Sequence, residues 1–153
     1  MQSLDEYDKN LLRLLQINNQ LTAKELAEKV SLSPSAVQRR LTRLREDKVI
    51  EADVSIVSPG IAGLDITCVV DVILHQGDSI TMEKFKSTLI NCPEVMQCYY
   101  VTGTYDFVMI VTTRNMQHYE QFSKRWLMDN PKVKHFYTHV VMEKVKVSMS
   151  VTI

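Results

Sequence analysis

SLSPSAVQRRLTRLREDKVIEADVSIV, residues 31–57, is the stretch that decides the fold of the first part of this chain. It opens with Ser33 and Pro34, a good helix cap followed by a residue that suits the first helical turn. Apolar residues then recur at helical spacing and predict one buried stripe, made of Val37, Leu41 and Leu44. The β-branched run at 49–57 predicts a strand after a turn. This order is typical of a DNA-recognition helix followed by a wing.

The outward side of this predicted helix carries side chains that suit nucleic acid. At about 100° per residue, these side chains fall opposite the apolar stripe or on its flanks. Arginine pairs well with guanine, glutamine with adenine, and small hydroxyls with phosphate. The residues predicted to contact DNA are Ser33, Ser35, Gln38, Arg39, Arg40, Thr42 and Arg43. The alternative is a solvated charged face that binds no ligand.

Two further helices are predicted upstream of this stretch. The segment 4–18 places leucines at helical spacing behind three acidic residues, which favour a helix N-terminus. In the next segment, Thr22 and Glu25 form a capping-box pattern. Only a three-residue turn separates that helix from the basic one. Helices joined in this way indicate a helix-turn-helix, and we predict a winged helix-turn-helix domain over residues 1–57.

Composition limits the class of protein. The chain has 153 residues and a formal net charge of zero, so attraction to DNA has to be local. The five basic residues from Arg39 to Lys48 face two acids, and so modest a patch is expected to need a second subunit. No apolar run approaches the ~20 residues of a membrane span, and the acidic, polar start is unlike a signal peptide. We therefore expect a cytoplasmic protein whose three cysteines are thiols.

The second part of the chain has a different character. Glycine and proline gather at 58–65, which predicts a hinge, and residues 66–153 then alternate β-branched and amphipathic segments. The predicted order is strand 66–76, helix 80–91, strand 94–103, strand 105–113, helix 115–130 and one or two closing strands within 133–153. This is the ferredoxin-like βαββαβ arrangement, so the fold class is α+β. Its uncovered sheet face is a physical reason to expect dimerisation.

Together these motifs resemble the leucine-responsive/asparagine-responsive (Lrp/AsnC, feast/famine) family of transcriptional regulators. The resemblance rests on LDEYDKNLLRLLQIN, on LTAKELAEKVSLSPSAVQRRLTRLREDKVI and on VTGTYDFVMIV at 101–111. It implies a sequence-specific regulator of double-stranded DNA. It also implies homodimers that assemble into tetramers or octamers and bind a small amino acid between dimers, near the 101–111 turn.

Within that turn, Gly103 and Asp106 occupy the matching positions of the family. A glycine lets backbone approach a ligand closely, and a carboxylate can receive an ammonium group. The effector site that the resemblance implies consists of Tyr100, Thr102, Gly103, Thr104, Asp106 and Thr138. The alternative is plain hairpin chemistry, since glycine and aspartate are favoured turn residues. Family members often carry an acid in place of Thr104 and a glycine in place of Lys48, so the ligand preference and the turn after the basic helix are expected to differ.

Two other classes of function stay open. Decarboxylases that act on a tetrapyrrole of the sirohaem type share this two-domain layout, and a DNA-compacting protein would lack an effector response. No nucleotide-binding, hydrolase or zinc-protease motif occurs, so we predict no enzyme and no cofactor. His135 and His139 fall in a β-rich run, where their spacing only places them on one face, and we predict no metal site.

Overall fold

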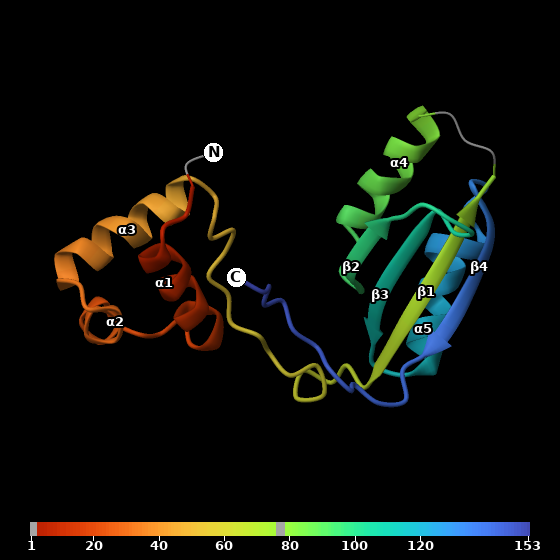
Figure 1. Cartoon of the computed structure of the whole chain (residues 1–153). Helices are drawn as coiled ribbons and strands as arrows, with labels where there is room; N and C mark the ends of the chain where they lie inside the picture. The colour runs from red at the N-terminus through yellow and green to blue at the C-terminus, as the bar shows by residue number, and fades with distance from the viewer. Residues whose placement is uncertain (1–2, 76–78) are drawn as a thin grey trace. The chain divides into compact units, whose positions relative to one another are not determined.

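Three helices and a four-stranded sheet with its own helices form two separate units (Figure 1). The computed structural model describes residues 3–75 and 79–153. Gln76, at the end of a predicted strand, lies outside the described residues. The first unit contains the chain up to Ile56 together with Lys146–Ile153, and the second is Val57–Val145. The last eight residues therefore group with the N-terminal unit, whereas we had placed them with the second domain.

The N-terminal unit contains the three predicted helices. They are α1 (Glu6–Ile17), α2 (Ala23–Val30) and α3 (Pro34–Glu46). Their inward faces share one buried cluster of Leu11, Leu12, Leu26, Ala27, Val30, Val37, Leu41 and Leu44. The helix-turn-helix is confirmed, including the predicted stripe on α3.

Side-chain caps begin all three helices. Thr22 and Glu25 form the predicted capping box, and Asp5 and Asp8 form a second one at the start of α1. At α3 the hydroxyl of Ser33 accepts from the backbone N–H of Ala36 at 3.2 Å. Such bonds satisfy N–H groups that have no partner inside the helix. Local capping residues therefore determine where these helices begin.

The predicted wing is wrong. Residues 49–57 form no strand, and Val54, Ile56 and Val57 are 65%, 86% and 66% exposed. β-propensity alone does not make a strand, because each strand needs a hydrogen-bonded neighbour. No strand of the described residues pairs with this segment. Ile50 packs against the helix-turn-helix core, whereas Val54, Ile56 and Val57 are left exposed in a single chain.

The C-terminal unit has the predicted βαββαβ order. Its elements are β1 (Ile66–Leu74), α4 (Ser79–Ile90), β2 (Val95–Tyr100), β3 (Phe107–Thr113), α5 (Met116–Ser123), which continues into a π-helical turn at Lys124–Met128, and β4 (Val133–Val140). The sheet order is β2-β3-β1-β4 and every neighbouring pair is antiparallel. This confirms the ferredoxin-like arrangement. A second closing strand after β4 is not formed.

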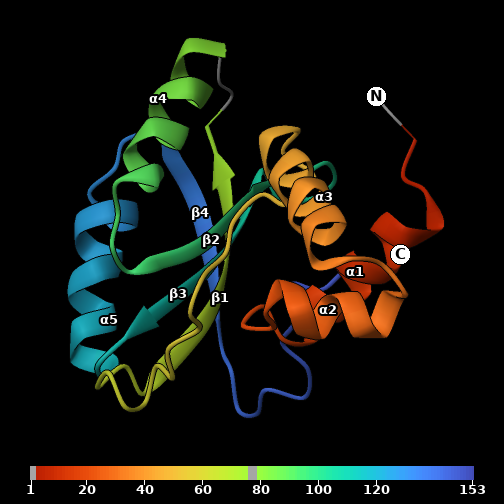
Figure 2. The same ribbon diagram turned by 90° about the vertical axis from the view of Figure 1, so that its left-hand side faces the viewer.

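Both helices cover one face of the sheet, as Figure 2 shows. Alternate residues of the central strands point to this layer: Val70 pairs with Met109, and Val72 with Phe107. All four are buried with Phe85 of α4 and with Phe122 and Leu127 of the α5 region. The intervening residues of β1 and β3 point to the other face, which neither α4 nor α5 covers.

Candidate DNA-binding face and effector turn

The exposed face of α3 is the candidate DNA-binding surface. Ser35, Gln38, Arg39 and Thr42 are exposed there, opposite the buried stripe. Within residues 3–75 and 79–153, the side chains of Gln38, Arg39 and Thr42 have no hydrogen bond or ion pair. Their donors and acceptors are therefore available to a ligand.

Arg40 and Arg43 are engaged inside the protein instead. The carboxylate of Asp8 accepts from Arg40 Nη1 at 2.8 Å and from Arg43 Nη2 at 2.5 Å, and Arg40 also bonds Asp5 at 2.7 Å. Asp8 is only 1% exposed, whereas the side chains of Arg40 and Arg43 are 21% and 40% exposed. The hydrogen bonds that Arg40 donates to Asp8 and Asp5 raise the pKa of Arg40. The two arginines tie α3 to α1.

Asp8 was missed by sequence reasoning, which counted it only as one of three acids before a helix. The available signal was its place in α1: an acid whose neighbours three and four residues on, Leu11 and Leu12, are core residues. A carboxylate in that position is buried, and a buried carboxylate needs a paired cation. Arg40 and Arg43 supply that cation.

The start of α3 uses its two serines locally. The Ser33 hydroxyl caps the helix, and it lies 3.1 Å from the hydroxyl of Ser35. Both side chains are exposed. Ser33 thus has a structural bond that explains its presence without a ligand, while its remaining hydrogen-bonding capacity faces solvent.

The end of α3 has the geometry that a glycine usually provides. Lys48 has φ +56°, and its N–H donates to Arg45 O at 3.1 Å while Val49 N–H donates to Leu44 O at 2.9 Å. This is the Schellman pattern of a helix C-terminus. The expectation of a differently shaped turn at Lys48 is therefore wrong: the lysine adopts the left-handed conformation despite its Cβ.

The segment between β2 and β3 forms an exposed turn stabilised by Asp106. Thr102, Gly103 and Thr104 are exposed, and Gly103 has φ +126°, which only glycine adopts readily. The Asp106 carboxylate accepts a hydrogen bond from Leu74 N–H at 2.8 Å. The backbone N–H of Asp106 donates to Val72 O at 2.9 Å. Asp106 thus ties the turn to the end of β1. The bond from Leu74 uses one carboxylate oxygen, and no residue of 3–75 or 79–153 donates a hydrogen bond to the other.

The structure brings Tyr100 next to this turn but not Thr138. Tyr100 ends β2, pairs with Phe107 and lies under the ammonium group of Lys86, 5.0 Å from the ring centre. Thr138 lies on β4, at the opposite edge of the sheet, where its hydroxyl bonds the hydroxyl of Tyr119. The Thr138 hydroxyl is thus engaged with Tyr119, whereas Tyr105 of the turn packs against the neighbouring Tyr137, with ring centres 5.8 Å apart.

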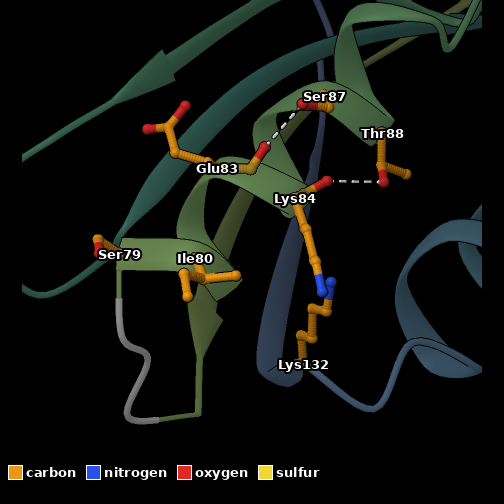
Figure 3. A pocket seen from close by; sticks show the side chains of 7 residues that line it. All are labelled: Ser79, Ile80, Glu83, Lys84, Ser87, Thr88 and Lys132. Atoms are coloured by element: carbon orange, nitrogen blue, oxygen red, sulfur yellow. Dashed lines mark hydrogen bonds between the residues drawn. The ribbon is translucent and has the colours of Figure 1, made fainter.

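An open groove of about 620 Å³ runs beside α4 (Figure 3). It is lined by Ser79, Ile80, Glu83, Lys84, Ser87, Thr88 and Lys132. The amines of Lys84 and Lys132 point toward one another in Figure 3. None of the predicted effector residues lines this groove.

Metal-binding geometry is absent from the part of the chain that the structure describes. No group of three or more His, Cys, Asp or Glu side chains there is placed to hold an ion. His139 instead pairs with the largely buried Asp71 at 3.1 Å. Within the same described residues, no helix has the length and apolar content needed to cross a membrane.

The cysteines are three free thiols, of which Cys68 and Cys92 are buried and Cys98 is exposed. Burial and the nearby Glu94 carboxylate raise the pKa of Cys92 from 9.0 to about 12. Unfolding restores the ordinary pKa, so this thiol favours the folded state below pH 9, and the contribution is lost as the pH rises toward 12.

At pH 8 a disulfide reagent such as DTNB should therefore modify one thiol per native chain and three per unfolded chain. The reason is that the thiolate is the reactive form, and Cys68 and Cys92 are both buried. Rapid reaction of all three thiols in the native protein would contradict this packing.

Two family models match the chain. The AsnC-type helix-turn-helix domain matches residues 4–45, and the Lrp/AsnC ligand binding domain matches residues 67–151. The first match contains α1, α2 and nearly all of α3. The second contains the sheet, except for the first residue of β1, and the Gly103–Asp106 turn.

Curated relatives span nearly the whole chain. The HTH-type transcriptional regulator y4tD of Sinorhizobium fredii is 50% identical over 98% of this chain and 89% of its own length. Transcriptional regulator AzlB of Bacillus subtilis is 32% identical over 98% and 96%. The leucine-responsive regulatory protein of Escherichia coli is 28% identical over 95% and 88%.

Solved structures share the fold. A transcriptional regulator of Neisseria meningitidis, solved as an L-Met complex, has a TM-score of 0.93 at 27% identity and covers 98% of this chain and 97% of its own. An AsnC family regulator of Agrobacterium tumefaciens has a TM-score of 0.92 at 26% identity and covers 97% of each chain. With the helix-turn-helix and the ferredoxin-like unit in place, these matches show that the chain belongs to the Lrp/AsnC family and is a DNA-binding transcriptional regulator.

Proposed function

We propose that this regulator binds operator DNA through the exposed face of α3 and that a small amino acid bound at the C-terminal unit changes this binding. The working form is a homodimer that assembles into a tetramer or octamer. The observation that supports DNA binding is the set of exposed α3 side chains that have no hydrogen bond or ion pair among the described residues: Gln38, Arg39 and Thr42.

These three side chains are proposed to contact DNA, and Arg40 and Arg43 have a different, structural role. Arg39 and Gln38 have the donors and acceptors that read base edges, and Thr42 suits phosphate. Arg40 and Arg43 hold α3 against Asp8 of α1. The half-exposed Arg43 keeps donors free for a phosphate. Ser33 and Ser35 belong to the helix start, where backbone N–H groups favour an anion.

The chemistry of the exposed turn between β2 and β3 supports binding of an amino acid. An amino acid presents an ammonium and a carboxylate group, and the second oxygen of Asp106 suits the ammonium. Backbone around Gly103 is accessible to the carboxylate because no Cβ shields it. Thr102 and Thr104 add hydroxyls, and Tyr100 borders the turn. The Thr138 hydroxyl is engaged with Tyr119 within one chain. The structural relative from Neisseria meningitidis was solved with L-Met.

The sheet face that neither α4 nor α5 covers supports the dimer. Val69 pairs with Ile110 at its centre, and Val108 pairs with Asp71 and Tyr99. Tyr99 and Tyr137 are 51% and 49% exposed on the outer strands. These apolar side chains lie beside the Asp71–His139 pair on the same face, and their exposed surface favours burial against a second sheet.

Ile110→Glu should dissociate the homodimer, because the interface would then bury an unpaired carboxylate. The expected light-scattering result after gel filtration is a mass of one chain, 17.6 kDa. Ile90→Glu is the matched control, since Ile90 is 82% exposed on α4 of the opposite layer. An unchanged mass for a folded Ile110→Glu variant would contradict this interface.

A thermal-shift screen of the twenty amino acids tests the effector part. A ligand at one hundred times its Kd stabilises the native state by about 2.7 kcal/mol. We expect one or a few related amino acids to raise the melting temperature. If none shifts it while operator DNA is bound specifically, an effector-independent DNA-binding protein is the better description.

Asp106→Asn should weaken binding of the amino acid found in this screen by about tenfold or more, since it removes the charge that faces the ammonium group. The asparagine oxygen still accepts from Leu74 N–H, so the melting temperature without ligand should change little. Calorimetry of both proteins measures the effect. Thr113→Val, at a buried position at the far end of β3, removes a polar group without touching the turn. Wild-type affinity in Asp106→Asn would remove Asp106 from the site.

A further inference from the structure

The segment Lys146–Ile153 follows the C-terminal unit in sequence but belongs to the N-terminal one. It is held there by two side chains of α1. Gln16 Oε1 accepts from Val151 N–H at 2.6 Å, and Gln16 Nε2 donates to Val151 O at 3.1 Å. Arg13 Nε donates to Ile153 O at 2.9 Å. The side chain of Ile153 packs against the helix-turn-helix core cluster.

Gln16 contacts the segment as a neighbouring strand would. The Gln16 amide pairs with both the N–H and the C=O of Val151. Gln16 therefore binds the backbone of the segment and not a side chain. The apolar side chain of Ile153 supplies the anchor, whereas Val147 and Val151 are 73% and 68% exposed. Three hydrogen bonds to backbone and the side chain of Ile153 hold the segment on this unit.

We propose that Lys146–Ile153 is a latch that docks reversibly on α1 and gives the helix-turn-helix a second connection to the C-terminal unit. Three hydrogen bonds to backbone and one apolar side chain would be too few to bind a separate peptide, because each bond replaces a bond to water. In the same chain the effective concentration of the segment is in the millimolar range, so the docked state is populated and still releasable.

The latch matters because the chain then passes between the units twice, at Ile56–Val57 and at Val145–Lys146. One connection lets a domain rotate about a single linker, and two connections restrict that rotation. The exposed segment 49–57, which has no strand partner in the described chain, does not provide this restraint by itself. The range of positions open to α3 therefore depends on whether the latch is docked.

Hydrogen exchange of the full-length protein, followed by mass spectrometry, tests the docking. In the wild type we expect amides of 146–153 to exchange about tenfold more slowly than in Gln16→Ala, because that variant loses both bonds to Val151. Exchange within α1 should be equal in the two proteins, which shows that the helix is intact. Gln20→Ala is the matched control, since Gln20 is exposed just beyond α1, and it should exchange like the wild type.

Several results would overturn the latch. One is exchange of 146–153 at the rate of an unstructured peptide in the wild type, and another is equal exchange in wild type and Gln16→Ala. Protection that disappears when the protein is diluted would show that the segment docks on a second copy, which contradicts a latch within one chain. All of these readouts are independent of DNA and of any amino acid.

The restraint that the latch places on the helix-turn-helix is tested by a separate distance measurement. Spin labels at Lys24→Cys and Lys134→Cys, with the exposed Cys98 replaced by serine, report the distance between the units. Labelled chains diluted into an excess of unlabelled protein limit the signal to pairs within one chain. We expect a broader distance distribution when Gln16→Ala is added. Equal widths would show that the docked segment does not restrain the helix-turn-helix.

Discussion

Arg39→Ala should lower the affinity for operator DNA by about 1–3 kcal/mol for each bound helix, or about 5- to 150-fold. Arg39 is exposed at the centre of the outward face of α3, and its guanidinium has no partner among the described residues. The loss should fall mainly on specific DNA, because a bidentate contact to guanine distinguishes one base from another. Titration of labelled operator and random DNA at fixed salt measures both effects.

Arg114→Ala is the matched control for this prediction. Arg114 is also exposed but belongs to the C-terminal unit, and its loss changes the net charge by the same amount. We expect operator affinity within about twofold of wild type in Arg114→Ala, since distant surface charges are screened. Equal operator affinity for Arg39→Ala and wild type would show that the reading face of α3 is placed wrongly.

Asp8→Ala should destabilise the helix-turn-helix by about 2–3 kcal/mol. Removing one partner of a buried ion pair costs about 3–5 kcal/mol, and the partial exposure of Arg40 and Arg43 reduces this value. The helix start weakens as well, since Asp8 belongs to the capping box of α1. Hydrogen exchange within 4–45 measures the loss in this unit alone, which a single melting temperature of two units does not.

Asp53→Ala separates this effect from ordinary surface charge. Asp53 pairs with Arg45 at 2.9 Å, but both side chains are 40% exposed, so the loss should stay below about 1 kcal/mol. Similar losses in the Asp8 and Asp53 variants would mean that the buried pair does not hold α3 to α1.

The helices were predictable because their signals are local. Ser33, Thr22 and Glu25 mark helix starts within a few residues of themselves, and the stripe of Val37, Leu41 and Leu44 needs only helical spacing. The βαββαβ order was predictable for the same reason, since each element carries its own period.

The predictions that were wrong concern structure that depends on more than the local sequence pattern. The run at 49–57 has strand composition, but a strand forms only where another strand can pair with it. Lys48 illustrates a second limit: the helix C-terminus adopts the left-handed conformation without the usual glycine because the bonds to Leu44 and Arg45 stabilise it.

The candidate site was predicted in part for similar reasons. An exposed polar face follows from helical periodicity, so Gln38, Arg39 and Thr42 could be named from the sequence. The periodicity does not show which arginines are used internally, and Asp8 lies more than thirty residues from Arg40 and Arg43. The opposite-edge position of Thr138 follows from strand order, which the family resemblance alone did not provide.

Binding of the purified protein to genomic DNA fragments, measured with and without each of the twenty amino acids, is the most direct test of an amino-acid-responsive regulator. We predict selective binding to a small set of fragments over random DNA, and a change in affinity or in the protected footprint with one amino acid or a few related ones. The same change should be absent in Asp106→Asn. Equal affinity for every fragment, with no response to any amino acid, would contradict the proposal.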